Sequence, residues 1–135
     1  HPLSSGTSHS AQYAVAGVMK AVNDGTYNYR DDVLEYGEKA KMMKDAFTSN
    51  GFKFTYDEDL GEPIADGFYF TYYYPGFTGA ELLEKMLYYG ISAISLDTCG
   101  STRQGIRACT SLIQRDEIPV LAERLKRFAE DHPIK

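Results

Sequence analysis

Two segments in the middle of the chain alternate with a period of two, and this pattern limits the possible folds more than any other feature. The first segment runs from Phe52 to Tyr56, and the second, which is aromatic on both faces, runs from Phe68 to Tyr74. Successive side chains of a β-strand point to opposite faces of a sheet, so both segments are predicted to be strands. Asn50-Gly51 precedes the first strand and Pro75-Gly76 follows the second, as expected for breaks in regular structure.

Apolar residues at helical spacing predict two helices before these strands. The first helix is expected to begin at its N-cap Ser10 and to end at Gly25. Its apolar face would comprise Val15, Val18, Met19 and Val22. The second helix follows Tyr29, has two aspartates near its N-terminus and stops at Asn50-Gly51. Its apolar face would comprise Val33, Tyr36, Ala40, Met43 and Phe47.

Two more helices and two short strands follow in the second half of the chain. Thr78 and Glu81 have the spacing of a capping box, which predicts a helix that ends at Gly90. The segments 91–96 and 105–111 are expected to be strands, and 57–66 and 97–104 loops. A last helix would start near Asp116 and tolerate Pro119 in its first turn.

The order of these elements predicts the fold class. It reads helix, helix, strand, strand, helix, strand, strand, helix, which fits two layers. We therefore expect an α/β (α+β) two-layer domain with a small, mostly antiparallel sheet of three to four strands and helices packed on one face.

Composition argues against several classes of partner. The formal net charge is -5, and the 14 basic residues are scattered among 19 acidic ones, which disfavours nucleic acid. No apolar run approaches the roughly 18 residues of a membrane span, and the first residues lack the pattern of a signal peptide. The two cysteines are expected to be reduced, as in a cytoplasmic protein, and the histidines show no metal-ligand spacing.

Arg107 is the residue that most needs an explanation, because it lies in a strand of otherwise small and apolar residues. A guanidinium in such a strand must find an anion or solvent. It could lie on the solvent face of an open sheet, pair with an internal carboxylate, or bind a ligand. Arg103 in the neighbouring loop is either an exposed arginine or a second anion contact, and the tyrosines at 69 and 72–74 are read mainly as packing residues.

The stretch from Gly90 to Phe128 resembles the end of class I/II, fold-type I aminotransferases, which depend on pyridoxal phosphate (PLP). That family ends with a G-x-(I/V)-R-small segment, an acidic pair that opens a helix, and an L-x-x-x-L-x-x-F pattern, all of which occur here. The segments 67–70 and 8–14 resemble two further family motifs in the same order. The loop 97–104 departs from the Pro-Gly turn that many relatives carry.

The resemblance implies that the chain is the C-terminal small domain of an aminotransferase. Residues 1–27 would form a junction that follows a large domain, and residues 28–135 the small domain. Arg107 would bind the α-carboxylate of an amino acid or a 2-oxo acid, with Arg103 as a second contact. PLP and its catalytic lysine would belong to the full-length enzyme, a homodimer, because no lysine here has the family's Ser-Lys context. The alternatives are a stand-alone amino-acid-binding or regulatory domain without catalysis, and an interaction domain.

Overall fold

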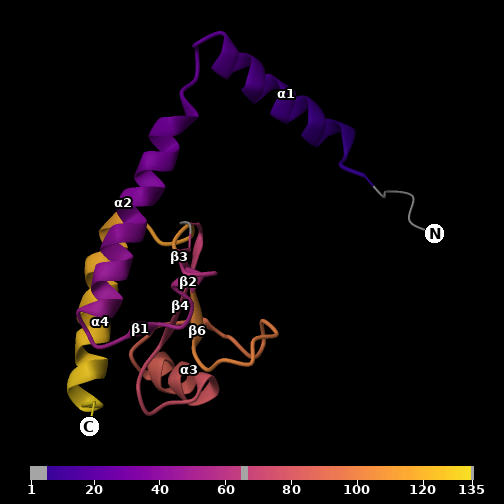
Figure 1. Cartoon of the computed structure of the whole chain (residues 1–135). Helices are drawn as coiled ribbons and strands as arrows, with labels where there is room; N and C mark the ends of the chain where they lie inside the picture. The colour runs from indigo at the N-terminus through magenta and orange to yellow at the C-terminus, as the bar shows by residue number, and fades with distance from the viewer. Residues whose placement is uncertain (1–5, 65–66, 135) are drawn as a thin grey trace. The chain divides into compact units, whose positions relative to one another are not determined.

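Helices and strands follow one another in the predicted order, with one addition. The computed structural model describes residues 6–64 and 67–134 (Figure 1). Within these residues lie the helices α1 (His9–Asn23), α2 (Tyr29–Thr48), α3 (Gly79–Tyr88) and α4 (Ile118–Asp131). The strands are β1 (Lys53–Phe54), β2 (Glu58–Asp59), β3 (Glu62–Pro63), β4 (Tyr69–Tyr73), β5 (Ile94–Ser95) and β6 (Ile106–Cys109). Internal contacts divide the chain into two units, His1–Glu35 and Tyr36–Lys135.

The first unit contains α1, which begins two residues earlier than predicted. Ser8, not Ser10, is the N-cap, because its hydroxyl accepts a hydrogen bond from the Ala11 N–H at 3.3 Å. The Gln12 side chain adds a bond to the carbonyl oxygen of Thr7 at 2.8 Å and extends the capped end of the helix. The helix stops before Gly25, which has a φ of +73°, as the sequence predicted. No residue of α1 is buried within its own unit.

The C-terminal half of α2 forms part of the helical packing surface of the second unit. Ala40, Met43 and Phe47 are buried as predicted, whereas Val33 is exposed. Lys39 is also buried, and its ammonium lies 5.3 Å from the centre of the Tyr36 ring. The apolar stripe of α2 is therefore buried only in the second half of the helix, where it packs on the sheet.

The sheet is antiparallel and has the strand order β1-β4-β6-β5. In β4 and β6, Thr71 lies opposite Arg107 and Tyr72 opposite Ile106. The strands at β1 and β5 are shorter than the predicted segments, since only two residues of each pair in the ladder. The predicted alternation in β4 is confirmed: Phe70, Tyr72 and Tyr74 are buried and the residues between them are not.

A small hairpin, β2 and β3, occupies the segment predicted as a plain loop. Glu58 pairs with Pro63 and Asp59 with Glu62. Leu60 and Gly61 between them have φ values of 53° and +83°, the two positive values that a tight two-residue hairpin turn requires. Because the strands are two residues long and fully exposed, no hydrophobic alternation marked them in the sequence.

The two faces of the sheet differ, and this confirms the predicted fold class. One face carries Phe70, Tyr72, Ile106 and Ala108, which are buried together with side chains of α2, α3 and α4. The other carries Tyr69, Thr71, Tyr73, Arg107 and Cys109, which are half-buried or exposed. We call this second surface the open face. The molecule is thus a two-layer α/β unit with a four-stranded antiparallel sheet whose helices pack on one face.

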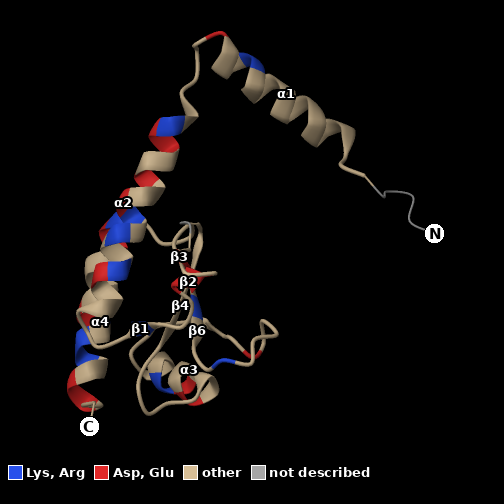
Figure 2. Cartoon of the chain, in the orientation of Figure 1, with Lys and Arg blue, Asp and Glu red and all other residues tan. Residues whose placement is uncertain are grey.

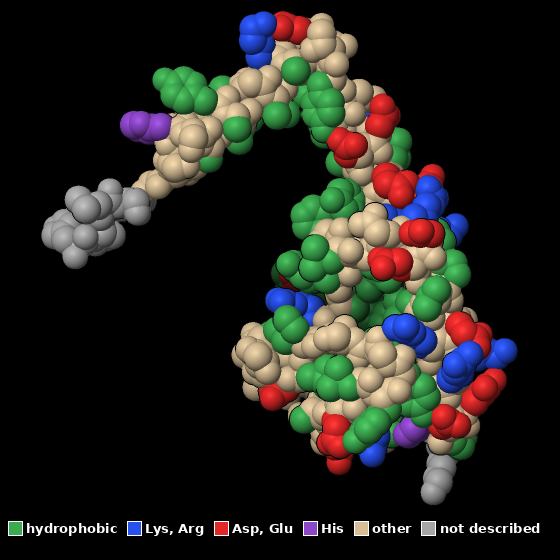
Figure 3. Space-filling model, turned by 180° about the vertical axis from the view of Figure 1, so that it is seen from behind, with side chains coloured by type: hydrophobic (Ala, Val, Ile, Leu, Met, Phe, Trp, Pro, Cys, Tyr) green, Lys and Arg blue, Asp and Glu red, His purple; other side chains and the backbone are tan. Residues whose placement is uncertain are grey.

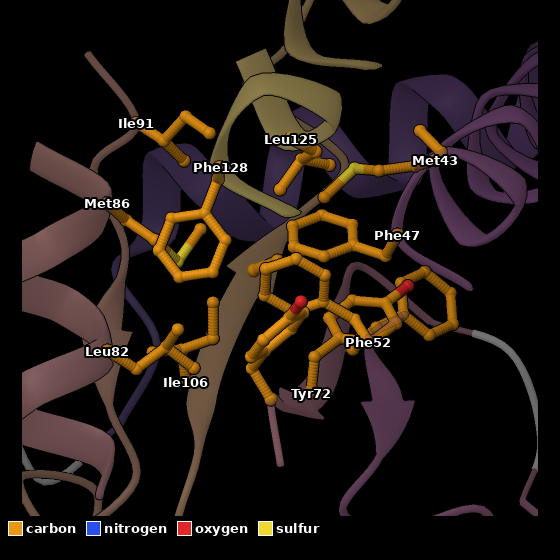
Figure 4. Close-up of a cluster of buried hydrophobic side chains, with 14 of the residues drawn as sticks. Met43, Phe47, Phe52, Tyr72, Leu82, Met86, Ile91, Ile106, Leu125 and Phe128 are labelled. Carbon is orange, nitrogen blue, oxygen red and sulfur yellow. The ribbon is translucent and has the colours of Figure 1, made fainter. Parts of the chain in front are cut away.

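Aromatic rings fill the centre of the core (Figure 4). Phe47 of α2 stacks on Tyr72 of β4 with ring centres 4.1 Å apart and planes only 5° from parallel. Phe52 meets the Phe47 ring edge-on, at 5.2 Å. Phe128 of α4 contacts Phe52 and Tyr74 at 5.7 and 5.2 Å. These contacts join α2 to β4 and α4 to the residue that follows β4.

Tyr72 and Tyr74 make opposite use of their hydroxyl groups, which gives a matched pair of stability predictions. Both rings are buried, but the Tyr74 hydroxyl donates to the carbonyl oxygen of His132 at 2.7 Å, whereas the Tyr72 hydroxyl has no partner in the described residues. We expect Tyr72→Phe to raise the free energy of unfolding by about 1 kcal/mol and Tyr74→Phe to lower it by about 1 kcal/mol. Urea denaturation followed by circular dichroism measures both. If both variants lost the same free energy of unfolding, the Tyr72 hydroxyl could not be unpaired.

The predicted starts of α3 and α4 are confirmed. The Thr78 hydroxyl accepts from the Glu81 N–H at 3.3 Å, and a Glu81 carboxylate oxygen accepts from the Thr78 N–H at 3.0 Å. These bonds from Thr78 hold the pKa of Glu81 below its ordinary value. A 3-10 turn over Arg115–Glu117 precedes α4, and Pro119 lies in its first turn.

Charged side chains are distributed along the helices. Both acidic and basic residues occur along α2 and α4, whereas α1 is almost uncharged (Figure 2). The face shown in Figure 3 likewise intersperses both signs of charge with apolar side chains. In the part of the chain that the structure describes, none of the helices has the length and hydrophobicity needed to cross a bilayer.

Candidate functional site

Gly105 sets the position of β6 against the rest of the sheet. Its φ is +143°, and a Cβ built on it would lie 2.5 Å from the carbonyl oxygen of Tyr72 and 2.6 Å from the Thr55 hydroxyl. Gly79, at the start of α3, also lies close to Gly105, because a Cβ added to Gly79 would lie 2.7 Å from the carbonyl oxygen of Gly105. The chain therefore passes through a narrow gap directly before β6, and only residues without a side chain fit there.

Arg107 projects from the centre of the open face. It is half-buried, between Thr71 of β4 and Ile94 of β5. Its guanidinium carbon lies 4.5 Å from the centre of the Tyr69 ring. In the described residues it makes neither an ion pair nor a hydrogen bond, so pairing with an internal carboxylate does not account for it. Arg107 is thus the charged residue of β4 and β6, whose other residues are uncharged.

Arg103 lies in the loop before β6 and has more contacts. Its Nη1 donates to the carbonyl oxygen of Thr55 at 2.7 Å, and its guanidinium carbon lies 4.6 Å from the centre of the Tyr56 ring. The Tyr56 hydroxyl is in turn 2.7 Å from the Ser101 hydroxyl. Arg103 therefore fastens the loop to the end of β1, a structural use that the sequence did not predict.

A short series of contacts connects the two arginines. Thr71 lies opposite Arg107, and its hydroxyl accepts a hydrogen bond from the Tyr56 N–H at 3.2 Å. Tyr56 carries the guanidinium of Arg103 on its ring. The structure thus places both predicted residues in one region, each stacked on a tyrosine.

Cys109 is a neighbour of Arg107 that the sequence did not single out. Burial raises the pKa of its thiol. Hydrogen bonds with the Ser111 hydroxyl, 3.1 Å from Sγ, and from two backbone N–H groups lower the pKa. The positive charge of Arg107 acts in the same direction as these hydrogen bonds, and together they outweigh the effect of burial, so the pKa of Cys109 lies below its ordinary value. Tyr69 is a second neighbour of Arg107, although the sequence indicated a packing role for it. The register of β4 and β6, which pairs Tyr69 with Cys109, brings Tyr69 close to Arg107, and a single sequence does not give that register.

A cavity of about 320 Å³ adjoins the two tyrosines. Tyr56, Tyr69 and Thr71 form part of its wall, together with Lys44 and Asp57, whereas neither arginine lines it. Its volume lies at the lower end of the range for small-molecule sites. A larger cavity of about 500 Å³ is lined mostly by apolar residues of α2, α4 and the segment 108–113. Neither Arg103 nor Arg107 lines it.

The described residues hold neither a metal site nor the groups that PLP needs. They contain no cluster of three or more His, Cys, Asp or Glu side chains. PLP requires a lysine for its Schiff base beside donors for its phosphate. The buried lysine, Lys39, faces the Tyr36 ring instead. The residues described therefore do not fit the cofactor.

Comparison with known proteins gives a distant similarity to a solved structure. No protein-family model matches the chain, and no curated protein matches it. A solved structure of the aminotransferase Aro9 from C. Albicans, with ligands, is similar to it with 18% sequence identity and a TM-score of 0.49. The similarity covers 73% of this chain and 24% of that one, so the chain matches about a quarter of the length of the aminotransferase.

Proposed function

We propose that this chain is the small domain of a PLP-dependent aminotransferase and that Arg107 binds the α-carboxylate of the amino-acid or 2-oxo-acid substrate. The observation that carries the proposal is the position of Arg107. It stands on the open face of the sheet, where its neighbours Tyr69 and Thr71 line a cavity, and it has no acidic partner in the described residues. A guanidinium held in this way has its hydrogen-bond donors available for an external anion.

The chemistry of arginine suits this role. Its planar fork binds a carboxylate through two parallel charge-assisted hydrogen bonds, which fixes the orientation of the ligand as well as its charge. In a closed cleft, such a clamp would hold the Cα–H bond of an amino acid in one direction relative to a reacting group. Lysine would preserve the charge and lose the fork.

The remaining parts of the proposal concern the whole protein. Arg103 would be a second contact to the ligand, because the bond to Thr55 uses one of its five N–H donors. PLP, which supplies amino-group transfer when bound, would be held by residues outside this chain, and so would the catalytic lysine. The active protein would be a cytoplasmic homodimer in which residues 1–27 lead from a large domain into this one.

Binding of pyruvate, a simple 2-oxo acid, tests the proposal directly. In nuclear magnetic resonance spectra of the ¹⁵N-labelled chain, pyruvate should shift the Nε–H signal of Arg107 in a saturable way. Arg107→Lys should weaken binding roughly tenfold, because a hydrogen bond to a charged group contributes about 1.5 to 3 kcal/mol. The affinity is followed in both proteins through the backbone amide signals of β4 and β6.

Arg127→Lys serves as the matched control. Arg127 is exposed on α4 and donates to Glu123 at 3.1 Å, so its replacement should leave pyruvate binding unchanged. Equal affinity of the wild-type chain and the Arg107→Lys variant would sink the proposed role of Arg107.

A further inference from the structure

The guanidinium of Arg107 lies against the face of the Tyr69 ring. Its guanidinium carbon lies 4.5 Å from the ring centre, within the range in which the electron-rich face of an aromatic ring attracts a cation. Tyr69 belongs to the strand opposite, two residues before Thr71, so both side chains project from the same face.

Arg103 provides the internal comparison. It too stacks on a tyrosine, at 4.6 Å, but it also donates to a backbone carbonyl at 2.7 Å. Arg107 has the ring contact without a hydrogen bond in the described residues. The orientation of Arg107 therefore depends on Tyr69 in a way that the orientation of Arg103 does not depend on Tyr56.

We infer that Tyr69 is a positioning residue that holds the guanidinium of Arg107 in place for a carboxylate. The inference rests on the proposed function and extends it to a residue that acts through Arg107. A guanidinium that stacks on a ring keeps the N–H donors in its plane free for an anion. Because the ring already restricts the flexible arginine side chain, less conformational freedom is lost when the carboxylate binds.

Tyr69 is itself suited to this task. Its backbone is fixed by pairing with Cys109 across β4 and β6, while its side chain remains 54% exposed. The ring thus contributes little to the core, whose aromatic residues point to the opposite face. Removing it should change the behaviour of Arg107 without unfolding the sheet.

The test compares Tyr69→Leu with Tyr69→Phe in the full 135-residue chain. Tyr69→Leu should weaken pyruvate binding about three- to fivefold, which corresponds to a cation–π contact at an exposed site. It should also lower the heteronuclear NOE of the Arg107 Nε–H group, which reports how ordered the side chain is. Tyr69→Phe keeps the ring face and should restore both values to those of the wild type.

Tyr73→Leu is the control, because Tyr73 lies on the same strand and face and carries no stacked guanidinium in the described part of the chain. It should leave the Arg107 signal unchanged. Should Tyr69→Leu fail to fold, Tyr69→Met offers a flexible side chain of similar length in its place. An NOE and an affinity that are unchanged by loss of the ring would overturn the inference.

The two proposals fail in different ways. If pyruvate binding does not depend on Arg107, the proposed function is wrong, whatever the order of the side chain. If Arg107 binds pyruvate but keeps its order and affinity in Tyr69→Leu, the proposed function stands and the role of Tyr69 is wrong.

Discussion

Gly105→Ala is expected to lower the free energy of unfolding by about 3 kcal/mol or more, because two unfavourable effects add at this position. The new Cβ would lie 2.5 Å from a backbone oxygen of Tyr72, which belongs to the central strand and cannot move without disturbing the sheet. The φ of +143° is also one that L-residues rarely adopt. Urea denaturation monitored by far-ultraviolet circular dichroism measures the loss.

Gly100→Ala separates these two effects. Gly100 also has a positive φ, +82°, but an added Cβ would meet no atom within 4 Å. We expect a loss of about 1 to 2 kcal/mol, from backbone conformation alone. A loss at Gly105 no larger than that at Gly100 would mean that β4 and β6 do not approach as closely as described.

Phe47→Ala should be the second strongly destabilising change, with a loss of about 3 to 5 kcal/mol. The Phe47 ring is 1% exposed and lies between Tyr72 and Phe52, so its removal leaves a cavity at the junction of α2 and β4. Ring contacts of this kind add about 0.5 to 1.5 kcal/mol to the effect of burial. Guanidinium chloride titration of the variant gives the difference directly.

Phe68→Ala is the matched control for Phe47→Ala. Phe68 is 50% exposed and makes one aromatic contact, with Tyr36 at 5.0 Å. We expect a loss of less than about 1 kcal/mol, within the range of surface substitutions and weak ring pairs. Similar losses in the two variants would place the centre of the core elsewhere than between α2 and β4.

Local signals in the sequence predicted the fold because each depends on neighbouring residues. The capping box of Thr78 and Glu81 and the alternation in β4 are both confirmed, since a hydrogen bond over three residues and a period of two are encoded locally. The N-cap of α1 was wrong by two residues, because Ser8 and Ser10 are equally good capping residues and only the structure shows which one accepts the bond. The sequence did not predict the β2–β3 hairpin, because its exposed strands show no alternation of apolar and polar residues.

The candidate site was predictable in part. Arg107 attracted attention because a guanidinium is unusual in such a strand, and the structure places it on the open face. Its contact with Tyr69 and the bond of Arg103 to Thr55 join residues 38 and 48 positions apart, which come together only when the sheet and its loops have formed. Periodicity gives the face on which a residue lies. It does not give the neighbour across the sheet.

The separation of the sheet into a covered and an open surface has a consequence for how this molecule could change over time. Stability is concentrated in the residues at even positions of β4 and β6, such as Tyr72 and Ile106, which are buried. The residues at odd positions, such as Tyr69 and Arg107, do little of the packing. Mutations could therefore alter what the outward surface recognises, one position at a time, while the scaffold beneath it keeps its shape.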